Sequence, residues 1–349
     1  MRKIAFLTDR TITAERLAPI QSIYREKYGL DPVIIHETNG TDNAEMQQYM
    51  LRMEHEGPSW LKPNEEYIRE VADAEILVTH FIGVNAEVMD AAKNLKLICV
   101  LRSGTENVDI PEAGRRGIAV VNAPGRLAGP VADYTVGMML AESRNIARSN
   151  LTSSGGEWCI RFSNFACSES MEGKRVGLVG LGPIGKSVVS RLLPFGVEAV
   201  AYDPYITQES LGNLPCRLTT MEEVMSTSDF ICVHARLTED TRNLIGEREI
   251  GMMKRTAYFI NTARAGLVNE DALVKALQER RIAGAALDVF QVEPIPKDHP
   301  LLKLDNVTLT PHLAGTANNV PEISLGMIES VIADYLAGKP VRDLAERYR

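Results

Sequence analysis

The chain has 349 residues, of which 45% are hydrophobic and 24% charged, which is an ordinary balance for a globular protein. The net charge of −8 and the absence of a basic tract argue against a nucleic-acid partner, and no apolar run is long enough to predict a membrane span. Five scattered cysteines without metal-type spacing favour a reduced, cytoplasmic protein with no metal site. The length predicts two domains.

The first part of the chain alternates strands and helices, as in a doubly wound α/β unit. Strands are expected at 3–9, 32–37, 74–80, 95–101 and 118–125. Segment 38–66 is longer than an ordinary connection and has a helical middle, so it is a lobe extension, a lid or simply a surface helix. The polar loop RSGTENVD follows the fourth strand, at the end of a parallel sheet where ligands collect.

A long helix is predicted at 130–148, between this unit and the next. Its apolar residues spread around most of its circumference, which indicates burial, partly against a second subunit. Trp60 and Trp158 are interpreted as packing residues. A last helix at 320–340 could return to the first unit. The predicted domains are therefore a discontinuous one, 1–122 with 317–349, and a second one at 123–316.

The segment KRVGLVGLGPIG, residues 174–185, predicts a strand, a tight turn and the start of a helix. Gly180, Gly182 and Gly185 have the G-x-G-x-x-G spacing, which lets a backbone approach a pyrophosphate at a helix N-terminus. Asp203 ends the next strand, where a carboxylate can accept hydrogen bonds from an adenosine ribose. No arginine follows Asp203, which favours NAD over NADP. The alternative is a structural glycine turn with a surface aspartate.

Three polar residues follow later strands. Arg264 comes after the strand at 256–263, and Glu293 comes after the strand at 282–290. The last strand begins the segment 306–315, and His312 follows it within that segment. An arginine can hold a carboxylate by two parallel hydrogen bonds, a histidine can transfer a proton near neutral pH, and a glutamate can orient that histidine. The alternatives are a solvated arginine, a surface glutamate and a histidine that caps a turn.

Several segments together resemble the D-isomer-specific 2-hydroxyacid dehydrogenases, which include phosphoglycerate, glyoxylate/hydroxypyruvate and D-lactate enzymes. The similarity runs from about Ala74 to Gly315. The segments that carry it are RSGTENVD, VADYTVGMMLAESRN, VGLVGLGPIG with AYDP, HARLTEDTRNLI, INTARAGLVNEDAL, ALDVFQVEPIP and LTPHLAG. The resemblance implies two doubly wound parallel-sheet α/β domains, a Rossmann NAD-binding domain and a flavodoxin-like substrate domain, and a homodimer formed through the long helix.

The resemblance also implies roles for the candidate residues. Arg264 would bind the substrate carboxylate and polarise the 2-keto oxygen. His312 would be the acid in reduction and the base in oxidation, with Glu293 paired to it. Backbone N–H groups at Ser103 and Gly104 would hold the carboxylate as well.

Residues along the cofactor are implied in the same way, with Asp288 near the nicotinamide carboxamide. The implied set is Gly180, Gly182, Pro183, Ile184, Gly185, Asp203, His234, Ala235, Arg236, Thr241, Thr262, Ala263, Asp288 and His312. Arg236 departs from the family pattern because it replaces a proline. Arg102 precedes the substrate loop and could either bind a second anionic group of the substrate or form a local salt bridge.

The sequence therefore predicts an NAD-dependent oxidoreductase that interconverts a D-2-hydroxy acid and a 2-keto acid. Two other hypotheses are an NAD(H)-sensing corepressor or scaffold of the same fold, and a formate- or phosphite-type dehydrogenase. The first would be expected to carry extended tails or peptide-docking features. The second lacks the Glu–His arrangement.

Overall fold

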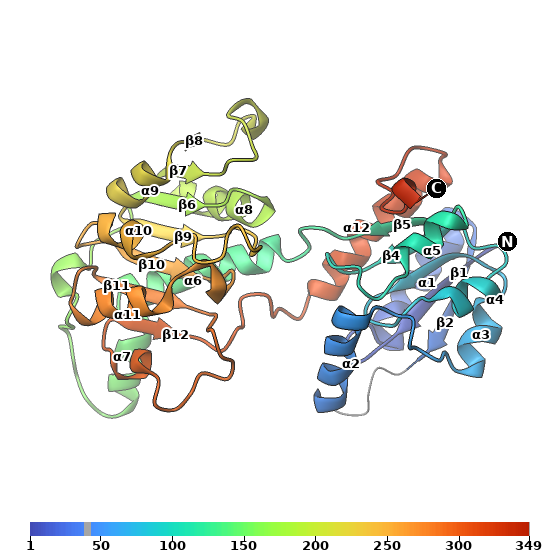
Figure 1. Ribbon diagram of the computed structural model, residues 1–349, viewed down its shortest axis with the longest axis horizontal. Coiled ribbons are helices and arrows are strands. Elements are labelled where there is room, and N and C mark those ends of the chain that lie inside the picture. The colour runs from blue at the N-terminus through green and yellow to red at the C-terminus, as the bar shows by residue number, and fades with distance from the viewer. Residues whose placement is uncertain (38–42, 349) are drawn as a thin grey trace. The chain divides into compact units, whose positions relative to one another are not determined.

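The computed structural model describes residues 1–37 and 43–348, and it divides into two compact units. Unit 1 comprises Met1–Arg126 and Asn318–Arg349, and unit 2 comprises Leu127–Ala317. Each unit is built on one parallel sheet with helices packed on it (Figure 1). The predicted fold class, two parallel-sheet α/β domains, is confirmed.

Unit 1 has a five-stranded sheet in the order β2-β1-β3-β4-β5, which is the flavodoxin-like order. The strands are β1 (Arg2–Thr8), β2 (Leu30–His36), β3 (Ala74–Thr79), β4 (Leu97–Val100) and β5 (Ala119–Asn122). The helices are α1 (Ala14–Tyr28), α2 (Asn43–Glu56), α3 (Glu65–Val71), α4 (Ala86–Ala91), α5 (Ile110–Arg115) and α12 (Val320–Leu336). Helix α2 occupies the predicted helical middle of 38–66, and residues 38–42 lie outside the described residues.

Local signals and long-range packing both shape unit 1. Helix α1 is capped by Thr13, whose side chain accepts a backbone hydrogen bond from Arg16, and by Gly29, whose φ of 64° suits a residue without a Cβ. Helix α12 comes from the far end of the chain. Its Leu325, Ile328 and Ile332 are buried in the same apolar cluster as side chains of β1, β3 and β4. Burial of this apolar face holds the C-terminal segment in unit 1.

Unit 2 has a seven-stranded sheet in the order β12-β11-β10-β9-β6-β7-β8, with β6 at the position where the order reverses. The strands are β6 (Arg175–Val179), β7 (Glu198–Tyr202), β8 (Cys216–Leu218), β9 (Phe230–Val233), β10 (Tyr258–Asn261), β11 (Gly284–Leu287) and β12 (Val307–Leu309). The helices are α6 (Ala128–Ser143), α7 (Ile146–Ser154), α8 (Pro183–Leu192), α9 (Met221–Thr227), α10 (Glu247–Met252) and α11 (Glu270–Gln278).

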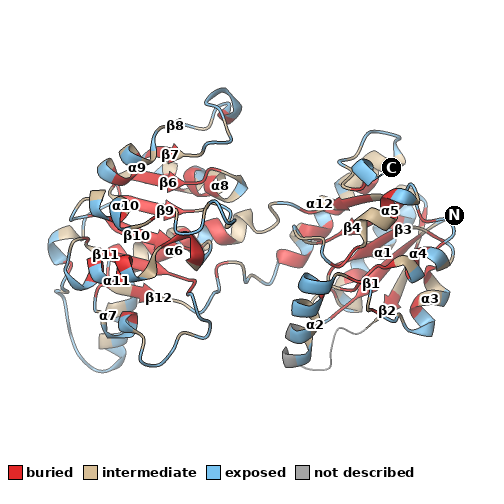
Figure 2. Cartoon of the chain, viewed as in Figure 1, coloured by how far each residue is buried: buried red, intermediate tan, exposed pale blue. Residues whose placement is uncertain are grey.

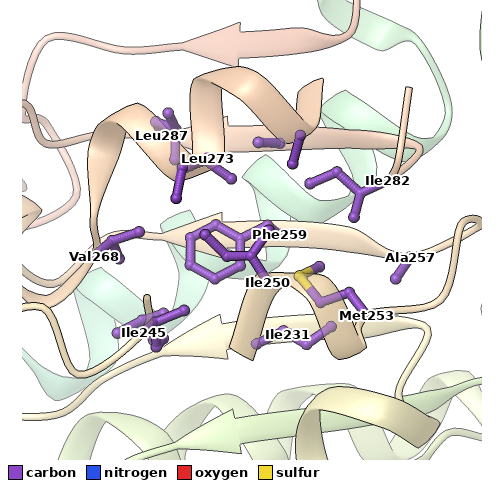
Figure 3. Close-up of a cluster of buried hydrophobic side chains, with 14 of the residues drawn as sticks. Ile231, Ile245, Ile250, Met253, Ala257, Phe259, Val268, Leu273, Ile282 and Leu287 are labelled. Carbon is purple, nitrogen blue, oxygen red and sulfur yellow. The ribbon is translucent and has the colours of Figure 1, made fainter. Parts of the chain in front are cut away.

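Apolar side chains from both layers form the core of unit 2. Ile231 and Phe259 project from the sheet toward Ile250 of α10 and Leu273 of α11, and all four are buried (Figure 3). Along both sheets the strands are buried, while the outer faces of the helices are exposed (Figure 2). The sheet is therefore a rigid support for the loops that leave its edge.

The long helix predicted at 130–148 is wrong in its C-terminal part. Helix α6 ends at Ser143, Asn145 has a left-handed φ of 58°, and α7 begins at Ile146. Arg148 donates to both carboxylate oxygens of the fully buried Glu142, at 2.6 and 2.7 Å, and Thr308 donates to the same carboxylate at 2.7 Å. This ion pair requires the chain to turn back, which helical periodicity does not reveal.

The two tryptophans differ. Trp60 packs edge-on against Tyr49 in unit 1, with 5.3 Å between ring centroids, as expected for a packing residue. Trp158 is 90% exposed in unit 2, so its interpretation as a packing residue of this chain is wrong.

Candidate active site

Three neighbouring strands of unit 2 carry the predicted catalytic residues. Strands β10, β11 and β12 are parallel and adjacent, so the loops after them leave the same edge of the sheet. Arg264, Glu293 and His312 lie on these three loops. The positive charge of Arg264 contributes to lowering the pKa of Glu293, which indicates that the two side chains are close.

His312 and Glu293 form a hydrogen-bonded pair, with 2.8 Å between His312 Nδ1 and Glu293 Oε2. The other carboxylate oxygen, Oε1, accepts from the backbone N–H of Phe290 at 3.0 Å. Burial acts to raise the pKa of Glu293, but the hydrogen bonds from His312 and Phe290 outweigh it and the pKa is lowered. The carboxylate is therefore ionised near neutral pH and can stabilise a protonated imidazole.

The loop that carries His312 is anchored by Asp288. This fully buried carboxylate accepts from Thr310 Oγ1 at 2.6 Å and from the backbone N–H groups of Leu313 and Ala314 at 2.8 Å each. His312 has a left-handed φ of 54°, a conformation uncommon for a residue with a Cβ. Asp288 therefore holds the Thr310 side chain before His312 and two backbone N–H groups after it, a role that the sequence did not predict.

The loop that carries Arg264 is anchored by Asn261, which the sequence analysis missed. The Asn261 side chain donates to the backbone oxygen of Arg264 at 3.1 Å and accepts from the N–H of Ala263 at 3.0 Å. Asn261 is buried at the end of β10, whereas Arg264 is exposed. An asparagine that ends an apolar strand and binds the backbone two residues later is a known turn signal, and it could have been recognised.

The glycine turn after β6 has the geometry that the G-x-G-x-x-G spacing predicts. Gly180 has a φ of 93°, and a Cβ there would lie 2.5 Å from the backbone nitrogen of Ala235. A Cβ at Gly185 would lie 2.6 Å from the oxygen of Gly180, so the first turn of α8 packs closely on the turn. Gly182 precedes α8, and a Cβ there would meet nothing within 4 Å. The N-terminus of α8 is thus open to a ligand.

A cavity of about 640 Å³ lies beside this turn. Among the predicted cofactor residues, those that line it are Gly180, Gly182, Pro183, Asp203, His234, Ala235, Arg236 and Thr241. The predicted residues Ile184, Gly185, Thr262, Ala263, Asp288 and His312 are not among those that line it. The cavity and the open glycine fit a dinucleotide, whose adenosine end would lie against Asp203.

Asp203 accepts two backbone hydrogen bonds, from Leu181 at 2.8 Å and from Tyr205 at 3.0 Å. The carboxylate therefore orders both sides of the cavity rim and keeps lone pairs available for ribose hydroxyl groups. Arg236 is exposed on the wall of the same cavity. The Thr241 hydroxyl donates to the Arg236 backbone oxygen at 2.7 Å, which holds this turn.

Two further cofactor candidates are His234, which is half-buried with enclosed ring nitrogens, and Thr262, which is buried. Both ring nitrogens of His234 lack a hydrogen-bond partner, and burial lowers the pKa of His234 to about 4, so the ring is neutral in the cavity wall. The Thr262 hydroxyl is 2.7 Å from the Thr135 hydroxyl of α6 and serves internal packing.

Arg102, Ser103 and Gly104 lie in unit 1, whereas the other predicted site residues lie in unit 2. Ser103 is exposed and Arg102 is half-buried. The Arg102 guanidinium stacks over the Phe81 ring, 4.4 Å from its centroid. No carboxylate of the described residues lies within 4 Å of it, so the local salt bridge is not observed.

Within residues 1–37 and 43–348, no group of histidine, cysteine, aspartate or glutamate side chains is arranged to hold a metal ion. In the same part of the chain, no helix has the length and apolar character needed to cross a membrane.

Comparison with known proteins identifies the family. Residues 136–314 match the model for the D-isomer specific 2-hydroxyacid dehydrogenase, NAD binding domain. The chain is 42% identical over 265 residues to a glyoxylate reductase of Thermofilum pendens, covering 74% of this chain and 78% of the relative. The chain belongs to the D-isomer specific 2-hydroxyacid dehydrogenase family. It is therefore an oxidoreductase, and its cofactor is NAD.

Two further similarities define how far the likeness extends. The chain is 39% identical over 278 residues to a D-3-phosphoglycerate dehydrogenase of Methanocaldococcus jannaschii, covering 79% of this chain but 52% of that relative. It thus spans about half of that protein's length. An NAD-complexed D-isomer specific 2-hydroxyacid dehydrogenase of Lactobacillus delbrueckii superposes with a TM-score of 0.76 at 22% identity, over 98% of this chain and 99% of the other. The likeness to this Lactobacillus structure supports the fold of two parallel-sheet α/β units.

Proposed function

We propose that this dehydrogenase reduces a 2-keto acid to a D-2-hydroxy acid, and catalyses the reverse oxidation, with Arg264, Glu293 and His312 as its catalytic residues. The observation that carries the proposal is the His312–Glu293 pair. It joins the loops after β12 and β11, and the loop after β11 lies next to the loop of Arg264 after β10. The family relationship supports the reaction class, and the distances and hydrogen bonds of unit 2 support the choice of residues.

In reduction, Arg264 would bind the substrate carboxylate and place a positive charge near the keto oxygen. Nε2 of His312 would donate a proton to that oxygen as the carbon accepts a hydride, so that C=O becomes CH–OH. Glu293, on Nδ1, would stabilise the protonated ring before the transfer. The bound cofactor would supply the hydride as NADH in reduction and accept it as NAD+ in oxidation. Asp288 and Asn261 would hold the two loops in position, which matters because a shift of about 1 Å can cost about 100-fold in rate.

The cofactor would bind in the cavity beside the glycine turn, with the phosphates at the N-terminus of α8 and the ribose at Asp203. The open space at Gly182 and the lone pairs of Asp203 support this assignment. In unit 1, backbone N–H groups at Ser103 and Gly104 would contribute to carboxylate binding. Unit 1 would accordingly be the substrate domain and unit 2 the NAD-binding domain.

We also propose a homodimer. Large apolar side chains are exposed on α7 and the segment after it: Ile146, Leu151, Trp158, Ile160 and Phe165. A surface of this kind is typical of a protein interface. Sedimentation equilibrium would test it, since a monomer at micromolar concentration would refute the dimer. A cytoplasmic location is proposed as well, supported by five unpaired cysteines, and cell fractionation would test it.

A panel of 2-keto acids with NADH and NADPH tests the reaction. We expect reduction of at least one keto acid, with NADH preferred. Arg264→Ala should lower kcat/KM by about 100-fold or more while NADH binding, followed by its fluorescence, is retained. Tight NADH binding without turnover of any keto acid would favour a sensing protein instead. Turnover of formate or phosphite alone would favour a formate- or phosphite-type dehydrogenase.

A further inference from the structure

The carboxyl edge of the unit 1 sheet gathers four polar side chains, each following a different strand. Asp9 follows β1, His80 follows β3, Arg102 follows β4 and Arg126 follows β5. These strands are consecutive neighbours in the order β1-β3-β4-β5, and the chain changes direction across the sheet between β1 and β3. In open parallel sheets, ligands bind at the carboxyl edge beside this point of reversal.

The two arginines at this edge have no carboxylate partner among the described residues. The Arg102 guanidinium contacts the Phe81 ring, and Arg126 Nη1 lies 3.5 Å from Ser324 Oγ. Arg102 and Arg126 follow the adjacent strands β4 and β5, so both leave the same part of the sheet edge. Burial lowers the pKa of both arginines, and the charge of Arg102 lowers the pKa of Arg126 further. Two neighbouring positive charges, each half-buried and unpaired, are unfavourable unless an anion joins them.

The nearby carboxylates do not supply that anion. Glu106, Glu54 and Asp9 attract the Arg102 guanidinium electrostatically, but none forms an ion pair with it. The Asp9 carboxylate is engaged elsewhere: Oδ1 accepts from the N–H groups of Thr11 and Ile12, and Oδ2 contacts His80. Glu54 and Glu106 are exposed.

The side chain of His80 gives an independent indication of a ligand. It is 2% exposed, with Nδ1 3.0 Å from Asp9 Oδ2, and its Nε2 is buried without a hydrogen-bond partner. The opposite edge of the ring therefore needs a partner that the described chain does not provide. Arg126 and Arg102 both act on the His80 ring electrostatically, so the ring lies in the same neighbourhood as the two guanidinium groups.

We propose that Arg102, Arg126 and His80 form a subsite for a second anionic group of the substrate, a phosphate or a distal carboxylate. This inference rests on the proposed function and narrows its substrate class to 2-keto acids with two negatively charged groups. Arg102 directly precedes Ser103 and Gly104, the loop expected to hold the 2-carboxylate, so the two anionic groups of one small molecule would span neighbouring parts of this edge.

The three side chains have complementary roles. The guanidinium groups donate paired hydrogen bonds to a phosphate or carboxylate and neutralise its charge. His80 shares one proton with an anion oxygen through Nε2, and Asp9 holds the ring from Nδ1. A phosphate monoester whose second ionisation has a pKa of about 6 can bring that proton itself.

Substrate pairs that differ only in the second charge test the subsite. The first pair is 2-ketoglutarate and 2-ketovalerate, and the second is 3-phosphohydroxypyruvate and hydroxypyruvate. With NADH, we expect kcat/KM for the charged member of at least one pair to exceed that of its partner by about tenfold or more. The pair that shows the preference tells whether a carboxylate or a phosphate is bound. Equal values in both pairs would overturn the proposal.

Arg102→Met and Arg126→Met keep an apolar stem of similar length but remove the charge. Each should lower the preference by about tenfold, mainly through KM, and Arg126→Lys should restore part of it. Arg69→Met is the matched control, since Arg69 is exposed on α3 and paired with Glu70. This variant should keep the wild-type ratio of kcat/KM between the charged and uncharged members of a pair. A preference that survives in both charge-removing variants would overturn the proposal.

Calorimetric titration of the same four acids gives the preference without turnover. An enzyme that reduces none of them but binds the charged members more tightly, through Arg102 and Arg126, would refute the proposed reaction and retain the subsite. An enzyme that reduces keto acids without regard to the second charge would retain the reaction and refute the subsite.

Discussion

Two histidine–carboxylate pairs stand at the carboxyl edges of the two sheets, and they differ in their access to solvent. In unit 2, His312 Nδ1 is 2.8 Å from Glu293, and the two side chains are 43% and 38% exposed. In unit 1, His80 Nδ1 is 3.0 Å from Asp9, and the side chains are 3% and 0% exposed. In both pairs the carboxylate takes Nδ1 and leaves Nε2 for another partner.

Burial gives these similar pairs different chemistry. Burial lowers the pKa of His80; the hydrogen bond and charge of Asp9 oppose this effect, and the charges of Arg126 and Arg102 reinforce it. His80 is therefore neutral near pH 7 in the absence of a ligand. His312, by contrast, is 43% exposed beside an ionised glutamate, so its ring is open to solvent. The geometry of a histidine–carboxylate pair therefore does not by itself identify a proton donor. The exposure of the imidazole ring to solvent must be considered as well.

Removal of His312 should have the largest effect. His312→Asn is expected to lower kcat for keto-acid reduction by about 100-fold or more, because general acid–base catalysis contributes that much, with little change in NADH affinity. His299→Asn is the matched control in unit 2, since His299 forms another pair, with Glu270 at 3.1 Å, and should keep near wild-type turnover. Equal losses in both variants would indicate a general structural effect and contradict the assignment.

Neutralising Glu293 should have a smaller effect on rate. Glu293→Gln keeps an oxygen that can accept from Phe290 but removes the negative charge beside His312. We expect kcat for reduction to fall by about tenfold or more, and the alkaline limb of the pH–rate profile to move to lower pH, since the protonated ring loses its stabilising charge. A pH–rate profile that coincides with that of the wild type would show that Glu293 only orients the ring.

Local sequence patterns were sufficient for the fold class because the strands are short apolar runs separated by helices with capping residues and glycines. The turn at Gly180 and the strand-end positions of Arg264 and His312 follow from the same alternation. The break at Asn145 was missed because it depends on the buried contact of Glu142 with Arg148 and Thr308, which lie on other elements.

The supporting residues of the site were missed for a related reason. Asp288 and Asn261 act through hydrogen bonds to backbone groups of the loops that carry His312 and Arg264. A backbone partner leaves no complementary residue type in the sequence. The Asp9–His80 pair joins residues 71 positions apart, so only the pairing of β1 with β3 brings them together.

The buried pair should make unit 1 sensitive to acid. The pKa of His80 is lowered from its ordinary value of 6.5, so below about pH 6.5 the unfolded chain binds a proton that the folded chain does not. Asp9 acts in the same direction: burial works to raise its pKa, but the hydrogen bond and charge of His80 and the N–H groups of Ile12 and Thr11 outweigh burial, and the pKa is lowered. Stability is therefore fully present above these ordinary values and falls as the pH drops.

Because the pKa of His80 is lowered in the folded chain, the free energy of unfolding should be smaller at pH 5.5 than at pH 7.5. His80→Gln can still donate a hydrogen bond to Asp9 but does not titrate, so its stability should depend less steeply on pH over this range. In a Trp158→Phe background, Trp60 is the only tryptophan and reports on unit 1. Urea unfolding followed by its fluorescence at the two pH values measures the difference. The same pH dependence with and without His80→Gln would mean that the folded chain binds a proton at this site as readily as the unfolded chain does, and the contrast between the two pairs would no longer hold.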